Sequence, residues 1–493
     1  MSSRVSFGPR LLAWLERESL PVTVFGLFVC GLIVRLPDQL RQDGWLALVS
    51  GRFVADSGLP TTDTLTAWTA HVQWVDQQWL GQLFLYRLAS AGNLRLVMLV
   101  HVALLAGALA AALVAARWRG GSARSVGLVA APALVVILMS AQMRAQSLAY
   151  PFFVAVAWLL IADARASSRR VLLVLPILVL WANIHGSVVL GAVLATVSGV
   201  LLVVRAVRKR AGSSKELLLR GTLLTVAPCL CVFASPYGSS LFHYYGSTAF
   251  NSSFGRIVSE WQHSWPSLLT LPFYVLAAIC VWLLFRTRRA LSTFEQLALL
   301  LLFLAGVAAL RNMVWFSFFA LIVLPLPLGK RIGEVRGKES KVVKTALAAA
   351  AIAAVSVAGA AAASRSDSWL TSSVYPTAAA DAVATAAATD PSARIYADVR
   401  FADWLLWTRP ELAGRIAFDA RFELLSSKEL EQLYRLQNQL TPQWKAAVAD
   451  HRLVVLPRGQ GSATARALMS QDGARRIYGD RSVVVLLRPR SRS

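Results

Sequence analysis

The chain has 493 residues, of which 56% are hydrophobic and only 15% are charged. Soluble domains average about 25% charged residues, so this composition, with a mean hydropathy of +0.55, excludes an ordinary soluble protein and indicates a polytopic membrane protein. The net charge of +24 suggests nucleic acid at first sight. Lys and Arg instead fall in short loops between apolar runs, as the positive-inside rule expects, so we expect a lipid bilayer and no nucleic acid as the partner.

The apolar runs predict about eleven membrane spans. The first two, at 21–37 and 94–116, enclose a long loop at 38–95. A run at 171–204 is too long for one span of about 20 residues and is broken near 183–186, so it is divided into two. The other spans are expected at about 125–141, 147–162, 217–234, 270–285, 292–310, 313–328 and 345–363.

The basic residues predict the orientation of these spans. Arg4, Arg10 and Arg17 precede the first span, which places the N-terminus in the cytoplasm, and no signal-peptide cleavage site follows that span. Further basic segments recur on the same side, at 117–124, 163–170, 205–210, 286–289 and 330–344. We therefore expect a multi-pass inner (plasma) membrane protein with a transmembrane domain at 1–363 and an extracytoplasmic C-terminus.

The first outer loop, 38–95, is patterned as two amphipathic helices lying in the membrane interface. Asp43 is the expected N-cap of the first helix, and Gly58 and Pro60 are expected to end it. Asp76 is the expected cap of the second helix. The apolar positions are Trp45, Val49 and Phe53 in the first helix and Trp79, Leu80, Leu83 and Phe84 in the second.

Aromatic residues mark both long outer loops, at 38–95 and 235–266. Tryptophans at a membrane interface usually anchor the protein in the bilayer, and this is the expected role of most of Trp45, Trp68, Trp74 and Trp79. Stacking on a sugar is the alternative for some of them.

The segment 364–493 has the pattern of a small extracytoplasmic α/β domain. An Ala-rich amphipathic piece at 377–389 leads into it. Strands are expected at 394–398, 415–419, 451–457 and 481–487, and helices at 427–437, 442–449 and 462–470. The glycines at 458–463 lack the spacing of a nucleotide-binding fingerprint.

Carboxylates in the first outer loop are the candidate acid–base groups. Asp43 lies just past the first span, and Asp63 follows in a Pro-Thr-Thr-Asp turn. The structural alternatives are a helix cap for Asp43 and Asp76 and a turn residue for Asp63.

Polar groups at the outer ends of several spans are the candidate binding residues. Ionisable groups there are costly and tend to face a cavity, and two arginines with a histidine suit a phosphate or pyrophosphate. Membrane-anchoring arginines and a satisfied buried histidine are the alternatives. The candidates are Arg144, Gln146, His185, Glu260, Trp261, Arg311 and Asn312.

Metal and disulfide signals are weak. The four cysteines, Cys30, Cys229, Cys231 and Cys280, lie in apolar runs, and neither His-Glu-x-x-His nor Asp-x-Asp occurs. We expect no metal and no other cofactor, although a divalent metal stays possible.

The order of these motifs resembles the glycosyltransferase-C superfamily, in particular uncharacterised bacterial membrane members with an extracytoplasmic C-terminal domain. The matching segments follow one another over nearly the whole chain: Asp43 with Trp45, 58–63, 74–80, 144–146, 181–186, 235–238, 259–262, 311–312 and 418–421. Gln78 departs from the pattern, because the relatives often have Glu there. A Gln cannot act as a base, and Asp63 or Asp76 is the expected replacement.

The resemblance implies inverting transfer of a sugar from a polyprenyl-phosphate donor to a glycan, lipid or protein acceptor of the cell envelope. It implies that Asp43 deprotonates the acceptor, with Asp63 as a second catalytic carboxylate, and that Arg144 and Arg311 bind the departing phosphate. Two other functions stay open: a transporter or flippase for lipid-linked saccharides, and a non-catalytic envelope assembly protein, which Gln78 favours.

Overall fold

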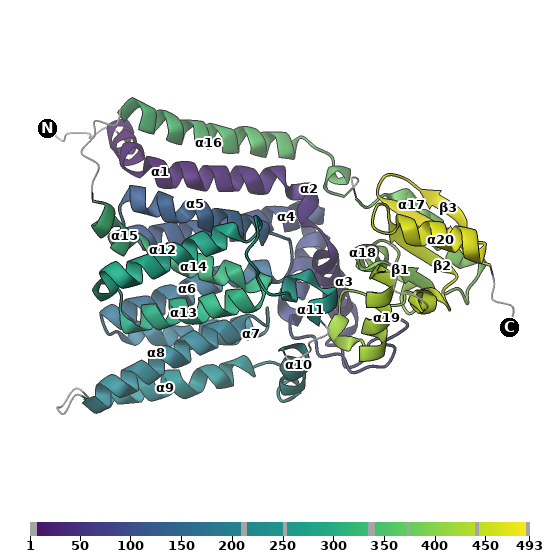
Figure 1. Ribbon diagram of the computed structural model, residues 1–493, viewed down its shortest axis with the longest axis horizontal. Coiled ribbons are helices and arrows are strands. Elements are labelled where there is room, and N and C mark those ends of the chain that lie inside the picture. The colour runs from purple at the N-terminus through teal and green to yellow at the C-terminus, as the bar shows by residue number, and fades with distance from the viewer. Residues whose placement is uncertain are drawn as a thin grey trace.

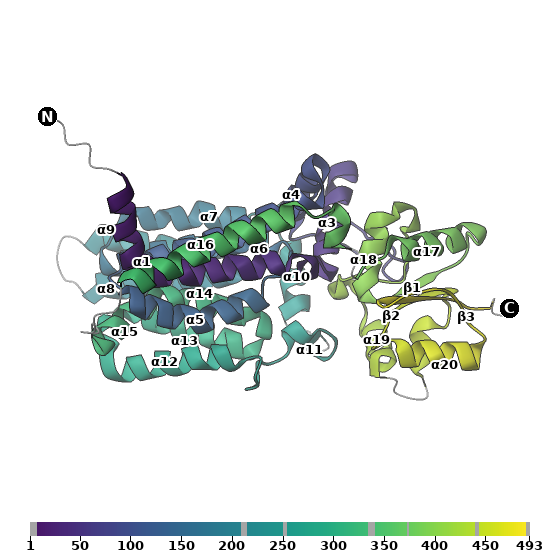
Figure 2. The same cartoon turned by 90° about the horizontal axis from the view of Figure 1, so that it is seen from above.

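The computed structural model describes residues 7–208, 214–249, 254–333, 341–371, 374–438 and 443–489. Long helices run side by side through most of the molecule, and a small α/β domain is attached at one end of them (Figures 1 and 2). The helices and the domain are joined through the first outer loop. The chain therefore has a helical part and a small C-terminal sheet, and the predicted domain boundary at 363/364 stays a prediction.

A helix occupies the position of every predicted span. These helices are α1 (Phe7–Val34), α4 (Trp79–Trp118), α5 (Ala123–Met139), α6 (Gln146–Arg165), α7 (Val174–Ala182), α8 (Val188–Arg208), α9 (Ser214–Val232), α12 (Leu271–Thr287), α13 (Thr293–Ala308), α14 (Met313–Val323), α15 (Pro325–Ile332) and α16 (Lys341–Ala363). Short 3₁₀ turns η1 (Arg169–Leu173), η3 (Arg288–Ala290) and η4 (Leu310–Asn312) connect some of them.

Only some of these helices are long enough to cross a membrane alone. Among the described residues, five pass by length and apolarity: α4, α6, α8, α16 and the part of α1 from Arg10 to Val34. The segments Leu310–Val323 and Pro325–Ile332, which meet at a bend of 50°, give a sixth candidate span if they are counted as one. The bend has a local cause, because proline lacks the N–H that would continue the helix. The predicted count of eleven therefore stays a prediction.

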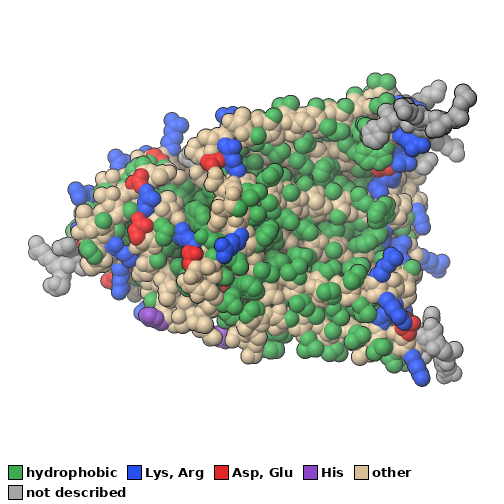
Figure 3. Space-filling view, turned by 180° about the vertical axis from the view of Figure 1, so that it is seen from behind, with side chains coloured by type: hydrophobic (Ala, Val, Ile, Leu, Met, Phe, Trp, Pro, Cys, Tyr) green, Lys and Arg blue, Asp and Glu red, His purple; other side chains and the backbone are tan. Residues whose placement is uncertain are grey.

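Surface composition supports the membrane assignment of the helical domain. Apolar side chains cover its flank, whereas Lys and Arg gather at the end away from the α/β domain (Figure 3). The last turns of α6 and α8 contribute Arg165, Arg205 and Arg208 to that end. This asymmetry is the one that the positive-inside rule assigns to a cytoplasmic face.

The orientation gives a testable prediction. Reporter fusions after residues 210, 289 and 344 should be cytoplasmic, and fusions at 266 and 493 should be extracytoplasmic, because every basic end should stay inside. A cytoplasmic reporter at 493 would contradict the orientation and would move every candidate site residue to the other face of the membrane.

The first outer loop differs from its prediction at both expected helix caps. It contains α2 (Leu36–Gln39) and α3 (Gln42–Ser57), and Gly58, at φ +81°, ends α3 as predicted. The N-cap of α3 is Arg41, so Asp43 lies inside the first turn.

The second helix of the loop begins at Trp79 and continues into the second span as α4. Its N-cap is Gln78, not Asp76, and its regular geometry is interrupted at Gly92 and Asn93. The predicted apolar stripe is also shifted by the packing, since Phe84 is exposed while Gly81 and Leu85 are buried.

The second outer loop folds into α10 (Ser240–Ala249), α11 (Phe254–Ile257) and the 3₁₀ turn η2 (Ser259–Trp261). Its η2 turn lies against η4, because Leu310 N–H donates to the carbonyl of Gln262 at 3.0 Å. Two outer segments far apart in sequence thereby meet.

The α/β domain contains one four-stranded sheet flanked by helices. Its elements are α17 (Thr377–Thr389), β1 (Ile395–Ala397), α18 (Val399–Thr408), α19 (Ser427–Asn438), β2 (Leu453–Pro457), α20 (Ser462–Asp472), β3 (Arg475–Gly479) and β4 (Val483–Leu487), with η5 (Asp367–Leu370), η6 (Pro410–Leu412), η7 (Phe422–Leu424) and η8 (Trp444–Val448). The strand order is β1-β2-β4-β3, with β1 and β2 parallel and the other pairs antiparallel.

Two predictions for this domain are wrong, and two of its elements were not predicted. The segment 415–419 is no strand of the sheet, since Ile416 makes only isolated bridges to Ile395 and Thr66. Helix α18 and the exposed edge strand β3 were not predicted. The predicted helix at 442–449 is the 3₁₀ turn η8 where it is described, and residue 442 lies outside the described residues.

One face of the sheet shares its core with the first outer loop. Alternate strand residues point to opposite faces, and Ile395, Leu453 and Val483 belong to the same buried cluster as Trp45 and Trp74. Trp45 packs edge-on against Tyr375 at 5.4 Å between ring centres, and Trp68 stacks on Phe418 at 5.3 Å. The expectation that most loop tryptophans anchor in the bilayer is therefore wrong for these three: they hold the α/β domain.

Candidate active site

A carboxylate–guanidinium cluster lies where the outer ends of the helices meet the α/β domain. Arg144, between α5 and α6, donates from Nη1 to both carboxylate oxygens of Glu260, at 2.9 and 2.7 Å. The same Nη1 lies 3.3 Å from Oδ2 of Asp43. The Arg144 side chain is 6% exposed, whereas that of Asp43 is 49% exposed. Asp43 is thus an accessible carboxylate held beside a buried cation.

The other predicted binding residues lie around this cluster. The Arg311 guanidinium stacks over Trp261, at 4.7 Å from the ring centre. Gln146 is the first residue of α6 and is buried. Asn312 donates to the carbonyl of Ala305 at 3.2 Å, and Nδ1 of His185 lies 2.7 Å from the Ser187 hydroxyl.

The pKa shifts of Glu260, Arg311 and His185 indicate that the charged groups of the cluster interact. Burial alone would raise the pKa of Glu260, but Arg144 and Arg311 outweigh it and lower that pKa. Burial lowers the pKa of Arg311, and neighbouring Arg144 lowers it further, while Glu260 and Asp43 oppose this change. Burial, then Arg311 and Arg144, hold the pKa of His185 well below its usual range. The cluster therefore contains two close cations balanced by two carboxylates, with His185 neutral.

Asp63 lies in a different environment from Asp43. Its side chain is fully buried and accepts hydrogen bonds from Leu65 N–H, the Thr66 and Thr69 hydroxyls and Arg421. Burial would raise its pKa, but Arg421 and these donors lower it. Both oxygens of Asp63 are thus occupied by hydrogen bonds, and its role as the second catalytic carboxylate stays a prediction.

Asp76 and Gln78 also differ from expectation. Asp76 is buried with Oδ2 unpartnered among the described residues, and burial raises its pKa to about 7. Gln78 caps α4 only through its backbone. Glu260, from the second outer loop, contacts the same Arg144 Nη1 as Asp43.

The raised pKa of Asp76 predicts a pH-dependent stability. Its folded-state pKa, about 7, exceeds the unfolded value, so the carboxyl favours the folded state below pH 4 and loses that contribution as the pH rises to 7. Replacing Asp76 by Asn should therefore stabilise the protein at pH 8 by at least about 1 kcal/mol, the value of one pKa unit. Melting curves at pH 5 and pH 8 check this, and a gain of equal size at both values would contradict it.

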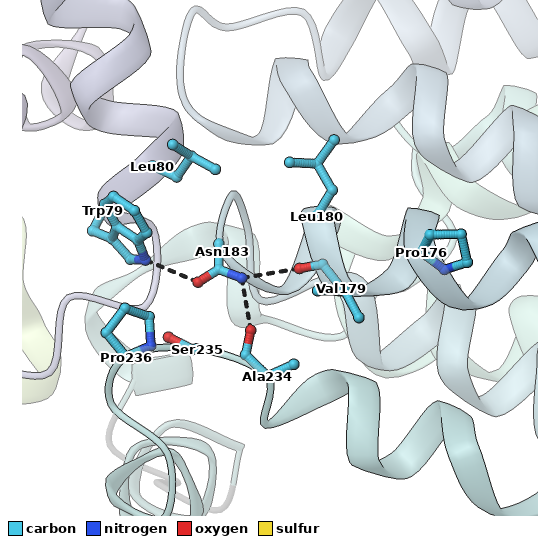
Figure 4. A pocket seen from close by; sticks show the side chains of 9 residues that line it. All are labelled: Trp79, Leu80, Pro176, Val179, Leu180, Asn183, Ala234, Ser235 and Pro236. Atoms are coloured by element: carbon cyan, nitrogen blue, oxygen red, sulfur yellow. Dashed lines mark hydrogen bonds between the residues drawn. The ribbon is translucent and has the colours of Figure 1, made fainter.

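An apolar groove opens at the turn that follows α7. Its volume is about 750 Å³, and it lies between the start of α4, the end of α7 and the segment after α9 (Figure 4). Asn183 lies in its wall, accepting from Trp79 Nε1 at 2.9 Å and donating to the carbonyls of Val179 and Ala234. The lining residues are Trp79, Leu80, Pro176, Val179, Leu180, Asn183, Ala234, Ser235 and Pro236.

One feature of the site region was not predicted. Arg421 and Asp419 form a buried ion pair at the loop, although the sequence showed residues 418–421 only as a recurring motif. Within the described residues, no group of three or more His, Cys, Asp or Glu side chains is placed to hold a metal ion.

Comparison with known proteins identifies the fold. No protein-family model and no curated protein sequence matches the chain. Among solved structures, ArnT from Cupriavidus metallidurans bound to undecaprenyl phosphate is similar at 13% identity, over 94% of this chain and 98% of that one, with a TM-score of 0.50. The chain has a glycosyltransferase-C-like fold. The predicted resemblance is thereby confirmed for the fold.

Two archaeal structures are also similar to this chain. The apo oligosaccharyltransferase of Archaeoglobus fulgidus is 12% identical, over 91% of this chain and 71% of that one, with a TM-score of 0.46. AglB from the same organism, in complex with an inhibitory peptide and a dolichol-phosphate, is 11% identical, over 90% and 70%, with a TM-score of 0.47.

Proposed function

We propose that this protein transfers a sugar from a polyprenyl-phosphate donor to an acceptor outside the membrane, with Asp43 as the general base. The observation that carries the proposal is the cluster at the outer face: a half-exposed carboxylate, Asp43, held beside the buried Arg144 and near the partly buried Arg311. A base next to a cationic anchor is what displacement of a phosphate by a hydroxyl requires.

The cations are supported as a phosphate site by the surrounding backbone. Helix α6 begins two residues after Arg144, and α14 begins two residues after Arg311. The N-terminus of a helix is the positive end of its dipole, which favours an anion nearby. Arg144 Nε is also buried without a partner among the described residues, so it can donate to a ligand. We therefore infer that Arg144 and Arg311, each beside the start of a helix, bind one phosphate group.

The chemistry follows from this arrangement. The acceptor hydroxyl attacks the anomeric carbon, and the bond from that carbon to the phosphate oxygen breaks on the opposite face, which inverts the configuration. The acceptor proton passes to Asp43, and the leaving phosphate keeps the bonding electron pair. Arg144 and Arg311 stabilise the charge that grows on the phosphate. Glu260 holds Arg144 in place, so Gln78 need not supply a carboxylate.

The apolar groove is the proposed path of the polyprenyl chain. Its wall includes Asn183, two residues before His185, whose pKa responds to Arg311 and Arg144. A chain entering there from the bilayer would bring its phosphate toward those arginines. The ArnT structure holds undecaprenyl phosphate, which supports a lipid-phosphate ligand for this fold. The glycan, lipid or protein nature of the acceptor is left to experiment.

We also propose that transfer needs no divalent metal, since Arg144 and Arg311 already supply two positive charges at the phosphate. Activity should therefore be the same, within about twofold, in EDTA and in added Mg²⁺ or Mn²⁺. A rate that collapses in EDTA and returns with the metal would contradict this assignment of the charge to arginine.

A lipid-linked sugar profile of a strain lacking the gene tests the function in the cell. A transferase predicts accumulation of its polyprenyl-phosphate sugar together with loss of the sugar from an envelope product. A flippase predicts accumulation of the donor on the cytoplasmic side only. An unchanged donor pool would contradict the proposal and would favour a non-catalytic assembly role.

A further inference from the structure

A buried ion-pair cluster joins the first outer loop to the α/β domain. Arg421 Nη2 donates to Oδ1 of Asp63 at 2.8 Å and to Oδ2 of Asp419 at 2.6 Å. All three side chains are at most 3% exposed. A buried charge that loses its partner is strongly disfavoured, so the loop cannot leave the domain without exposing this cluster to water.

The same guanidinium also contacts the far end of the loop. It lies over the ring of Trp74, 4.2 Å from its centre, and Trp74 is buried. Asp63 and Trp74 stand at the two ends of the segment 63–74. One Arg421 side chain therefore ties both ends of this segment to the α/β domain.

Backbone hydrogen bonds continue the attachment between these two ends. Ala67 N–H and Trp68 N–H donate to the carbonyls of Ile416 and Ala417, at 2.7 and 2.9 Å. Gly414 N–H donates to the carbonyl of Leu65 at 2.9 Å. The loop thus lies along residues 414–417 as an added strand would.

The attachment extends to the helix that carries Asp43. On α3, Arg52 donates to the carbonyls of Leu406 and Trp407 in α18, at 2.5 and 3.1 Å. Trp45, two residues after Asp43, packs against Tyr375. The α/β domain therefore contacts both α3 and the segment that follows it.

We propose that Arg421 is a positioning residue for sugar transfer. By tying Asp63 and Trp74 to the α/β domain, it holds α3 in place. Asp43 on α3 then faces the guanidinium groups of Arg144 and Arg311. The α/β domain is then required for catalysis through the position of α3. This inference rests on the proposed function.

The first test is steady-state transfer by the full-length Arg421→Gln variant in liposomes. We expect kcat to fall by about 10²-fold, the scale of a misplacement of about 1 Å. The donor KM should stay within about twofold, because Arg144 and Arg311 are untouched. Arg421→Lys should lie between wild type and Gln, since an ammonium keeps the charge but not the planar fork. Arg409→Gln, which removes an ion pair to Asp381 in the same domain, is the matched control and should not change kcat.

The second test is amide hydrogen exchange without substrate. In Arg421→Gln, exchange should speed up over 61–74 while β1, β2 and β4 stay protected. Unchanged exchange over 61–74, or faster exchange with an unchanged kcat, would overturn the proposal. If the sheet also loses protection in Arg421→Gln, that variant is replaced by Thr69→Val, which removes one hydroxyl donor to Asp63. Thr69→Val is judged by the same two measurements, kcat and amide exchange over 61–74.

The two tests separate this inference from the proposed function. A wild-type protein that transfers no sugar overturns the proposed function and the positioning role with it. The exchange measurement still decides in that case whether Arg421 holds the loop.

Discussion

Replacing Asp43 by Asn should lower the turnover of sugar transfer by about 10²–10⁴-fold, the usual contribution of a general base. The change keeps the size of the side chain and removes its charge and basicity. The melting temperature should stay within about 2 °C, because the cap of α3 is Arg41 and Arg144 keeps its two bonds to Glu260. Turnover measured beside a melting curve separates catalysis from folding.

A matched carboxylate on the same helix provides the control for this experiment. Asp56 lies near the end of α3 and is exposed, so Asp56→Asn should be silent in turnover and in stability. Full activity in Asp43→Asn would leave Asp43 as a charge partner of Arg144 only. The base would then have to be sought at Glu260, the other carboxylate of the cluster.

Replacing Arg144 by Gln should lower kcat/KM for the donor by about 10²–10³-fold, the effect of losing one donor to a developing oxyanion. Both binding and turnover should suffer, since the phosphate is charged before and after the bond breaks. Lys should rescue only part of the loss, because it lacks the fork that binds two oxygens. Arg311→Gln should act in the same direction.

The control is an arginine at the same face that lies outside the cluster. Arg35, at the outer end of α1, is exposed and donates to the carbonyl of Leu138. Arg35→Gln should keep donor affinity. Donor affinity that is unchanged in Arg144→Gln and Arg311→Gln would reassign both arginines to contacts with lipid headgroups.

Much of the fold could be predicted because membrane helices are encoded locally. Long apolar runs and the position of Lys and Arg suffice to place each helix, and a helix was found at every predicted run. The site residues Asp43, Arg144, Glu260 and Arg311 were predicted for a related reason. Asp43, Arg144 and Arg311 are ionisable groups near the predicted ends of spans, and Glu260 lies in the second outer loop; their role in a site stays a prediction.

The contacts between the loop and the α/β domain could not be predicted, because they join residues far apart in sequence. Asp63 and Arg421 are separated by 358 positions. The local pattern Pro-Thr-Thr-Asp predicts a turn whether or not a distant arginine contacts the Asp. Trp45, Trp68 and Trp74 resemble membrane anchors until the surface that covers them is known. The edge strand β3 was missed since its exposed Arg475 and Arg476 lack an apolar alternation.

The most direct measurement uses the full-length protein in liposomes with a polyprenyl-phosphate donor that carries one label in the sugar and another in the phosphate. An envelope extract supplies the acceptor. We predict that the sugar label moves to a new product, while an equal amount of labelled polyprenyl phosphate stays in the lipid, and that Asp43→Asn abolishes this separation. Two labels that stay in one molecule, whichever side of the membrane it reaches, would contradict the assignment as a glycosyltransferase.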